Sequence, residues 1–168
     1  MDSPSETLAH LDTDIEARVV AIRAAHPDWP CARGCDGCCH RLATLPELTP
    51  PEAERLRAAI AMLPATEIAA IRARLAALGP APSPPVTCPL LDPASGACPV
   101  YAARPVACRS YGFYVERDKG LYCTEIKNRV ASGVYDDVIW GNHEAIDTTL
   151  GRLGKPRPLG PDLLPPDE

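Results

Sequence analysis

The sequence predicts a mainly α-helical protein, in which a small helical domain packs around an irregular, cysteine-rich loop layer. Apolar residues recur at intervals of three and four along several stretches, which is the period of an amphipathic helix. Capping signals precede two of these stretches. The helical period then disappears over residues 86–125, where cysteine, proline, glycine and arginine recur instead. We therefore expect a single domain over residues 1–154, followed by a tail.

The first helix is expected over residues 4–25. Ser3 can cap its start, Pro4 suits the first helical position, and Glu6 completes a capping box. The apolar stripe of this helix consists of Leu8, Leu11, Ile15, Val19 and Ile22.

Residues 50–78 are expected to form an antiparallel helical hairpin that is interrupted at Pro64. Thr49-Pro50-Pro51-Glu52 repeats the start signal, and Gly79-Pro80 is a stop signal. The residues expected to face inward are Leu56, Ile60, Leu63, Ile68, Ile71, Leu75 and Leu78.

The remaining elements are a loop layer, a last helix and a tail. Within the layer at residues 86–125, Asp92-Pro93-Ala94-Ser95-Gly96 is a turn signal and predicts a short β-hairpin. The Pro-rich tail at residues 155–168 is predicted to be disordered. The last helix is expected over residues 134–153, with an apolar face of Val134, Val138, Ile139, Ile146, Leu150 and Leu153.

The composition argues against two classes of partner. A net charge of −5 and a pI of about 5.4 do not favour nucleic-acid binding, which needs a basic face. No stretch approaches the roughly 20 apolar residues that span a bilayer. The acidic start, MDSPSETLAHLDTD, does not resemble a secretory signal. We therefore expect a cytoplasmic protein, whose thiols are kept reduced.

The eight cysteines fall into two groups along the chain and are predicted to bind metal. A tight cluster and a distant set of loops together often supply the ligands of one site. Cys35-x-x-Cys38 lets two sulfurs converge on an ion at about 2.3 Å from each. We expect the two groups to meet in space, with all eight sulfurs as candidate ligands. The first group is Cys31, Cys35, Cys38 and Cys39, and the second is Cys88, Cys98, Cys108 and Cys123.

The residues leave several arrangements open. Because neighbouring side chains tend to diverge, Cys38 and Cys39 serve different ions, or one of them does not ligate. Eight thiolates can form two tetrahedral sites, one dinuclear site, or an iron–sulfur cluster with spare cysteines. Disulfides or unrelated buried thiols are the alternatives to metal. They are disfavoured because no export signal is visible and four cysteines within nine residues would strain any pairing among themselves.

Arginines near the cysteines fit a buried thiolate site. Four thiolates around a divalent ion leave a net charge of −2, which is costly to bury without nearby cations or donors. Arg33, Arg41, Arg104 and Arg109 all lie within six residues of a cysteine, and we favour Arg104 and Arg109 as residues that support the ligands.

The motifs CDGCC, CPLLD and GACPVYAARPVACRSYG resemble the CxxCxxCC cysteine-cluster family, which is described as a zinc- or iron-chelating domain. The resemblance implies metal binding by Cys31, Cys35, Cys38, Cys39, Cys88, Cys98 and Cys108, and Cys123 matches a later family cysteine. Three residues separate Cys31 from Cys35, where the family usually has two. A similar cluster occurs in proteins that methylate flagellin lysines, which keeps an enzymatic interpretation open.

Other polar residues carry weaker signals. His40 can join the ligands, but the sulfurs already suffice. His143 lies among acidic residues that are best interpreted as a solvated helix face. Tyr101, Tyr111 and Tyr114 can shield a metal, although packing is the simpler interpretation. No Walker loop, Rossmann fingerprint, GxSxG elbow or HExxH motif is found in the sequence, and no catalytic residue is assigned.

We therefore expect a metalloprotein that binds zinc or iron through thiolates, with a structural, storage or redox role. One alternative is an iron or iron–sulfur enzyme that acts on a protein or a small molecule. The other is a thiol redox sensor that uses Cys38 and Cys39.

Overall fold

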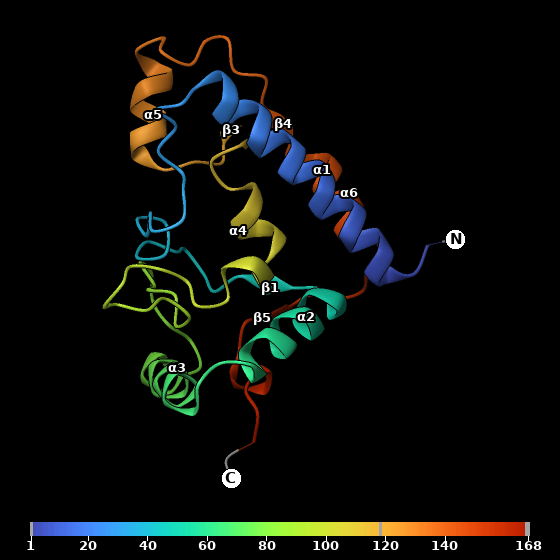
Figure 1. The fold of residues 1–168 in the computed structure, drawn as a ribbon, viewed down its shortest axis with the longest axis vertical. Coiled ribbons are helices and arrows are strands. Elements are labelled where there is room, and N and C mark those ends of the chain that lie inside the picture. The colour runs from blue at the N-terminus through green and yellow to red at the C-terminus, as the bar shows by residue number, and fades with distance from the viewer. Residues whose placement is uncertain (1, 118, 167–168) are drawn as a thin grey trace. The chain divides into compact units, whose positions relative to one another are not determined.

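The computed structural model describes residues 2–117 and 119–166 (Figure 1). The chain divides into two compact units. Unit 1 comprises residues 1–32 and 106–155, and unit 2 comprises residues 33–105 and 156–168. Helices make up most of the regular structure and the strands are only two or three residues long, so the prediction of a mainly α protein is confirmed. In the described part of the chain, no helix has the length and apolar character needed to cross a membrane.

Helix α1 (Pro4–Ala25) forms where its capping residues and apolar stripe indicate. The Glu6 amide donates to the Ser3 hydroxyl at 3.2 Å, and the Ser3 amide donates to the Glu6 carboxylate at 2.7 Å. These two bonds satisfy donors that a helix start otherwise leaves unpaired. All five residues of the predicted stripe are buried. Each contributes on the order of 1.5–3 kcal/mol by leaving water.

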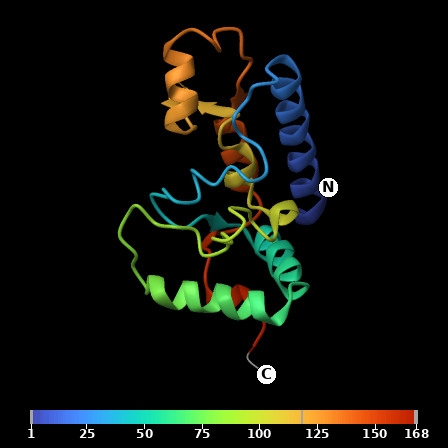
Figure 2. The same ribbon diagram turned by 60° about the vertical axis from the view of Figure 1, so that its left-hand side comes forward.

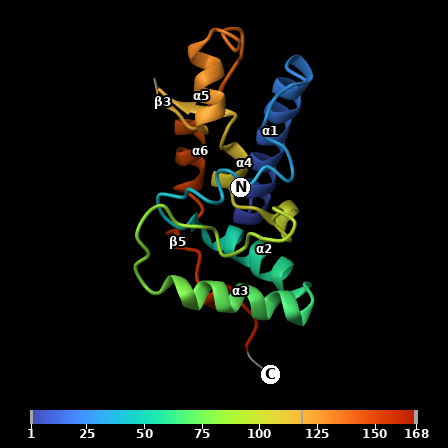
Figure 3. The ribbon, with the colours of Figure 1, turned by 90° about the vertical axis from the view of Figure 1, so that its left-hand side faces the viewer.

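The rest of unit 1 packs short elements against α1 (Figures 1 and 3). Helix α1 contacts α4 (Val106–Ser110) and α6 (His143–Leu150). A small sheet has β2 (Tyr114–Glu116) at its centre. Strand β2 pairs antiparallel with β3 (Lys119–Gly120) and parallel with β4 (Gly141–Asn142).

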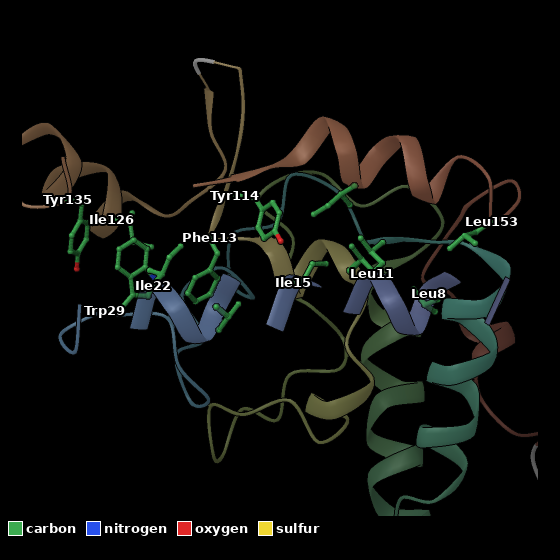
Figure 4. Packing of buried hydrophobic residues seen from close by; sticks show 13 residues of the cluster. Leu8, Leu11, Ile15, Ile22, Trp29, Phe113, Tyr114, Ile126, Tyr135 and Leu153 are labelled. Carbon is green, nitrogen blue, oxygen red and sulfur yellow. The ribbon is translucent and has the colours of Figure 1, made fainter. Parts of the chain in front are cut away.

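An aromatic cluster forms one end of the core of unit 1 (Figure 4). The Trp29 ring lies 4.4 Å from Tyr135, 5.8 Å from Phe113 and 5.6 Å from Trp140, measured between ring centroids. Trp140 also lies 5.1 Å from Tyr122. Offset contacts of this kind stabilise by about 0.5–1.5 kcal/mol beyond the area they bury. The apolar face of α1 packs into the same cluster, so α1 and the second half of the chain share one core.

Gly141 is expected to be essential for the packing of β4 against β2. A Cβ atom at this position would overlap the buried ring of Tyr114, which lies opposite it in the parallel pair. We predict that Gly141→Ala lowers the free energy of unfolding by about 1–3 kcal/mol, because the ring must move within a packed core. Denaturant unfolding measures this change. Gly37→Ala is the matched control, since its Cβ would enter open space. Equal stability of the two variants would contradict the prediction.

Unit 2 contains two consecutive helices, α2 (Pro50–Ala61) and α3 (Ala65–Leu78). The Glu52 carboxylate accepts bonds from the Thr49 amide at 2.8 Å and the Thr49 hydroxyl at 2.6 Å, which fixes the start of α2. Pro64 separates the helices, and α3 turns back relative to α2 with their axes crossed (Figure 3). The residues after α3 run as irregular chain up to the short helix η1 (Tyr101–Ala103) (Figure 2).

The tail that was predicted to be disordered contains regular elements within residues 157–163, and its residues 167–168 lie outside the described part of the chain. Strand β5 (Arg157–Pro158) pairs antiparallel with β1 (Glu47–Leu48), and a short helix η2 (Pro161–Leu163) follows. The side chains of Leu159, Leu163 and Leu164 are buried in the core of unit 2. Proline prevents long helices but is compatible with an edge strand. A Pro-rich composition therefore indicated irregular backbone correctly but did not exclude burial.

The last helix is shorter than predicted. Helix α5 (Thr124–Ala131) precedes a turn, and α6 begins only after Asn142, whose side chain accepts from the Glu144 amide at 3.0 Å. Val134 and Ile139, which were expected on the inner face of this helix, are exposed. The glycine at position 133, with φ +78°, lies in the turn that separates the two helices.

Candidate metal centre

The structure divides the cysteines differently from their order along the chain. Unit 1 contains Cys31, Cys108 and Cys123, whereas unit 2 contains five cysteines from both sequence groups. The five are Cys35, Cys38, Cys39, Cys88 and Cys98. Within unit 2, the CDGCC segment and the CPLLD segment therefore belong to one body.

A short antiparallel pairing brings these two segments together. The Leu42 amide donates to the Val86 carbonyl at 3.0 Å, and the Val86 amide donates back to the Leu42 carbonyl at 2.8 Å. Two residues further along, the Cys88 amide donates to the Cys39 carbonyl at 2.7 Å. These three bonds place Cys88 beside the vicinal pair, although almost 50 residues separate them in the sequence.

Two Cys-Pro turns hold the other cysteines of unit 2. The Leu91 amide donates to the Cys88 carbonyl, and the Tyr101 amide donates to the Cys98 carbonyl, each at 3.1 Å. Proline follows each cysteine at the second turn position, where its fixed φ is favourable. Each turn also directs backbone amides at its own sulfur, those of Leu90 and Leu91 at Cys88 and that of Val100 at Cys98. Amide donors favour a thiolate over a thiol.

The predicted turn between these cysteines forms, but as a single bridge rather than a longer hairpin. The Asp92 amide donates to the Ala97 carbonyl at 3.0 Å. The Asp92 carboxylate accepts from the Ala94 amide at 3.0 Å and the Ser95 amide at 3.2 Å. Cys88 and Cys98 thus flank one compact loop.

The CDGCC segment forms a tight turn around its cysteines. The His40 amide donates to the Asp36 carbonyl and the Arg41 amide to the Cys38 carbonyl, each at 3.2 Å. The His40 ring lies 3.1 Å from the Asp36 carboxylate on an exposed side. Cys35 is exposed, whereas Cys38 and Cys39 are partly buried.

Three thiols of unit 2 differ in the direction of their pKa shifts. A hydrogen bond with the Cys39 thiol lowers the pKa of Cys38 to about 6, and the charge of Arg104 contributes in the same direction. Burial raises the pKa of Cys88 to about 11, and negative charge on Cys98 and Cys38 adds to this effect. Burial also raises the pKa of Cys98, against the lowering influence of Arg104 and Arg33. Three sulfurs therefore lie close enough for their charges to interact.

The donor set of unit 2 fits a thiophilic ion in its chemistry, although its described side chains do not converge on one point in this structure. One cysteine of unit 2 favours its thiolate form, amides face two other sulfurs, and two arginines act on the same group. A cation beside these sulfurs would offset their mutual repulsion, and its binding would release the remaining protons. Within residues 2–117 and 119–166, no three Cys, His, Asp or Glu side chains converge closely enough to enclose an ion.

The cysteines of unit 1 lie in a more apolar setting. Arg23 donates twice to the Cys31 carbonyl, at 3.1 and 2.6 Å. The Cys31 sulfur lies against Gly112, where a Cβ atom would be only 2.5 Å from it, and the φ of +90° also favours glycine. Cys123 precedes α5, and Cys108 lies in α4. Cys31 and Cys123 both pack against the core of unit 1.

The other residues considered from the sequence have varied roles. Arg109 forms an ion pair with Asp12 at 3.3 Å. His143 pairs with Asp147, four residues later on α6, at 3.2 Å. Tyr114 is a core residue. Tyr101 was underestimated from the sequence, because two arginine guanidinium groups lie over its ring. Its position two residues after the Cys98-Pro99 pair was the available signal.

Residues 30–130, more than half of the chain, match the family model described as "CxxCxxCC: Putative zinc- or iron-chelating domain". No curated protein and no solved structure matches the chain.

Proposed function

The chain belongs to the CxxCxxCC family of zinc- or iron-chelating domains, and on this premise we propose that unit 2 binds one zinc or iron ion through Cys35, Cys38, Cys88 and Cys98. The metal is held for a structural, storage or redox role, in the cytoplasm, where thiols stay reduced. Cys31, Cys108 and Cys123 of unit 1 are candidate ligands of a separate ion.

The observation that carries this proposal is the pairing of the CDGCC segment with the first Cys-Pro turn. The Cys88 amide donates to the Cys39 carbonyl at 2.7 Å, which holds the two segments next to each other. Cys98 is joined to Cys88 through the intervening loop, so three of the four proposed ligands belong to chain segments that contact one another.

Within the vicinal pair, we assign Cys38 as the ligand and Cys39 as its hydrogen-bond donor. The Cys39 thiol is hydrogen-bonded to Cys38, and Cys35-x-x-Cys38 has the spacing at which two sulfurs reach one ion. Bound zinc or iron would supply charge that holds the thiolates together and, for iron, a redox centre. The protein would supply the thiolates, the amides that face them and the nearby arginines.

Substitution of single cysteines tests the assignment. Cys88→Ser and Cys98→Ser are each expected to weaken zinc binding by at least about tenfold, because a hydroxyl is a poor ligand for a thiophilic ion. Cys39→Ser is expected to bind nearly as the wild type does, because a serine hydroxyl still donates to the Cys38 sulfur. Metal content after purification without oxygen, followed by competition with a chromophoric chelator, measures both effects.

Ser83→Ala is the control, because Ser83 is an exposed residue of unit 2 that lies outside the cysteine-containing turns. Wild-type affinity in both Cys88→Ser and Cys98→Ser would refute the assignment. A wild-type protein that carries no metal, yet is alkylated first at Cys38, would instead favour the thiol-sensor alternative. The absorption spectrum separates the metals, since iron–sulfur clusters and ferric thiolates are coloured and zinc is silent.

A further inference from the structure

Two arginines share one tyrosine ring in unit 2. The guanidinium carbon of Arg104 lies 3.4 Å from the centroid of the Tyr101 ring, and that of Arg33 lies 5.5 Å from it. Both distances are within the range in which a cation is attracted to the face of an aromatic ring. Arg33 comes from the segment before the CDGCC cysteines, and Arg104 follows the second Cys-Pro turn.

Backbone contacts fix this arrangement beside Cys98. The Tyr101 amide donates to the Cys98 carbonyl at 3.1 Å, and the Arg104 Nε donates to the Tyr101 carbonyl at 2.9 Å. Arg55 of helix α2 donates to the Arg104 carbonyl at 2.9 Å. The position of the Arg104 guanidinium is therefore set by the same turn that positions a proposed ligand.

Placing two like charges on one ring is unfavourable unless negative charge lies nearby. Two like charges close together repel, and the repulsion grows as the effective dielectric constant falls. The bond from the Tyr101 amide to the Cys98 carbonyl places this ring in the turn of a proposed ligand. Cys38 and Cys98 would add negative charge there when they bind a metal as thiolates, and Arg104 acts electrostatically on both sulfurs.

We propose that Arg33 and Arg104, held on the Tyr101 ring, are the counter-charge of the metal–thiolate complex and set its affinity. The charges match, because four thiolates around a divalent ion carry −2 and the two guanidinium groups carry +2. This inference rests on the function proposed above. In this proposal Arg33, Arg104 and Tyr101 act through the proposed ligands and do not bind the metal themselves.

The test compares zinc affinities by chelator competition in full-length variants. Arg104→Met and Arg33→Met are each expected to weaken zinc binding about tenfold, the lower end of the range for residues that support metal ligands. The double variant is expected to be weaker than either. Arg104→Lys retains the charge and should recover part of the loss, whereas Tyr101→Phe retains the ring and should bind as the wild type does.

Two controls separate this role from simple stability. Arg57→Met removes another arginine of unit 2, whose side chain donates to the Asp162 carbonyl, and should leave affinity unchanged. Thermal unfolding in the presence of chelator should give the same midpoint for Arg33→Met and the wild type, because Arg33 is exposed. The cobalt-substituted proteins should retain their thiolate charge-transfer bands, which shows that the ligands are unchanged.

The results of this test distinguish failure of the counter-charge role from failure of the proposed metal site. Zinc affinity of the double variant within twofold of the wild type would overturn the counter-charge role and leave the proposed metal site standing. Equal losses in Arg104→Met and Arg104→Lys would also overturn it, since charge would then not matter. A wild-type protein that binds no zinc would overturn both proposals. If Arg104→Met fails to fold, the zinc affinity of Arg33→Met alone decides whether the counter-charge role holds.

Discussion

Removal of the metal is expected to abolish protection from hydrogen exchange over residues 33–44, while helix α2 remains protected. None of residues 33–44 is buried, so apolar packing contributes little to their order. A structural zinc site contributes on the order of 10–16 kcal/mol of apparent binding energy in small peptides at neutral pH. Leu56 and Ile60 of α2, in contrast, are fully buried in the core of unit 2. Packing alone should therefore hold that helix.

Hydrogen exchange with and without a chelator, resolved by peptide, measures this effect. Peptides from α1 are the internal control, because α1 belongs to unit 1 and has its own capping box and apolar face. The cysteine-rich turns after Val86 should lose less protection than residues 33–44, since Leu90, Leu91 and Val100 are buried. Unchanged protection of residues 33–44 would mean that the metal does not order this segment.

Deletion of the chain after Lys155 is expected to destabilise unit 2 strongly. The deleted segment includes strand β5, which pairs with β1, and the buried leucines at 159, 163 and 164. Each buried leucine contributes about 1.5–3 kcal/mol, so their sum approaches the whole stability of a typical domain, about 5–15 kcal/mol. The truncated protein should lose exchange protection in β1 and α2.

A single substitution measures how much one buried leucine of the tail contributes to stability. Leu163→Ala should lower the free energy of unfolding by about 2–5 kcal/mol, as measured by denaturant titration. Arg157→Ala is the matched control in the same segment, because its side chain is exposed and its backbone bonds remain. Full-length stability in the truncated protein would show that the tail packs without contributing to folding.

The helices with strong local signals could be predicted from the sequence. The Ser3 and Glu6 capping box and the regular apolar spacing in α1 are both local, and both occur in the structure. Helix α5 was missed because it buries only Ile126 and therefore has no apolar stripe to detect. The tail was predicted wrongly because its Pro-rich composition indicates backbone preference and does not show which leucines are buried in a core.

The candidate ligands could be named from the sequence, but their grouping in the fold could not. Spacing indicated the cysteines as candidate donors, and the segment from Asp92 to Gly96 predicted the turn between Cys88 and Cys98. The pairing of Leu42 with Val86, however, joins segments separated by two helices and follows from no local pattern. It decides that Cys88 lies beside Cys39. The role of Tyr101 depends on two arginines that are 71 residues apart, which a single sequence does not connect.

The aromatic cluster of unit 1 has a practical consequence for spectroscopy. Trp29 and Trp140 are the two tryptophans of the chain, and both lie in that cluster. Intrinsic tryptophan fluorescence therefore reports on the folding of unit 1. The thiolate charge-transfer absorption of a cobalt-loaded site would report on unit 2. The two optical signals, followed in one titration, would show whether the units unfold together or one after the other.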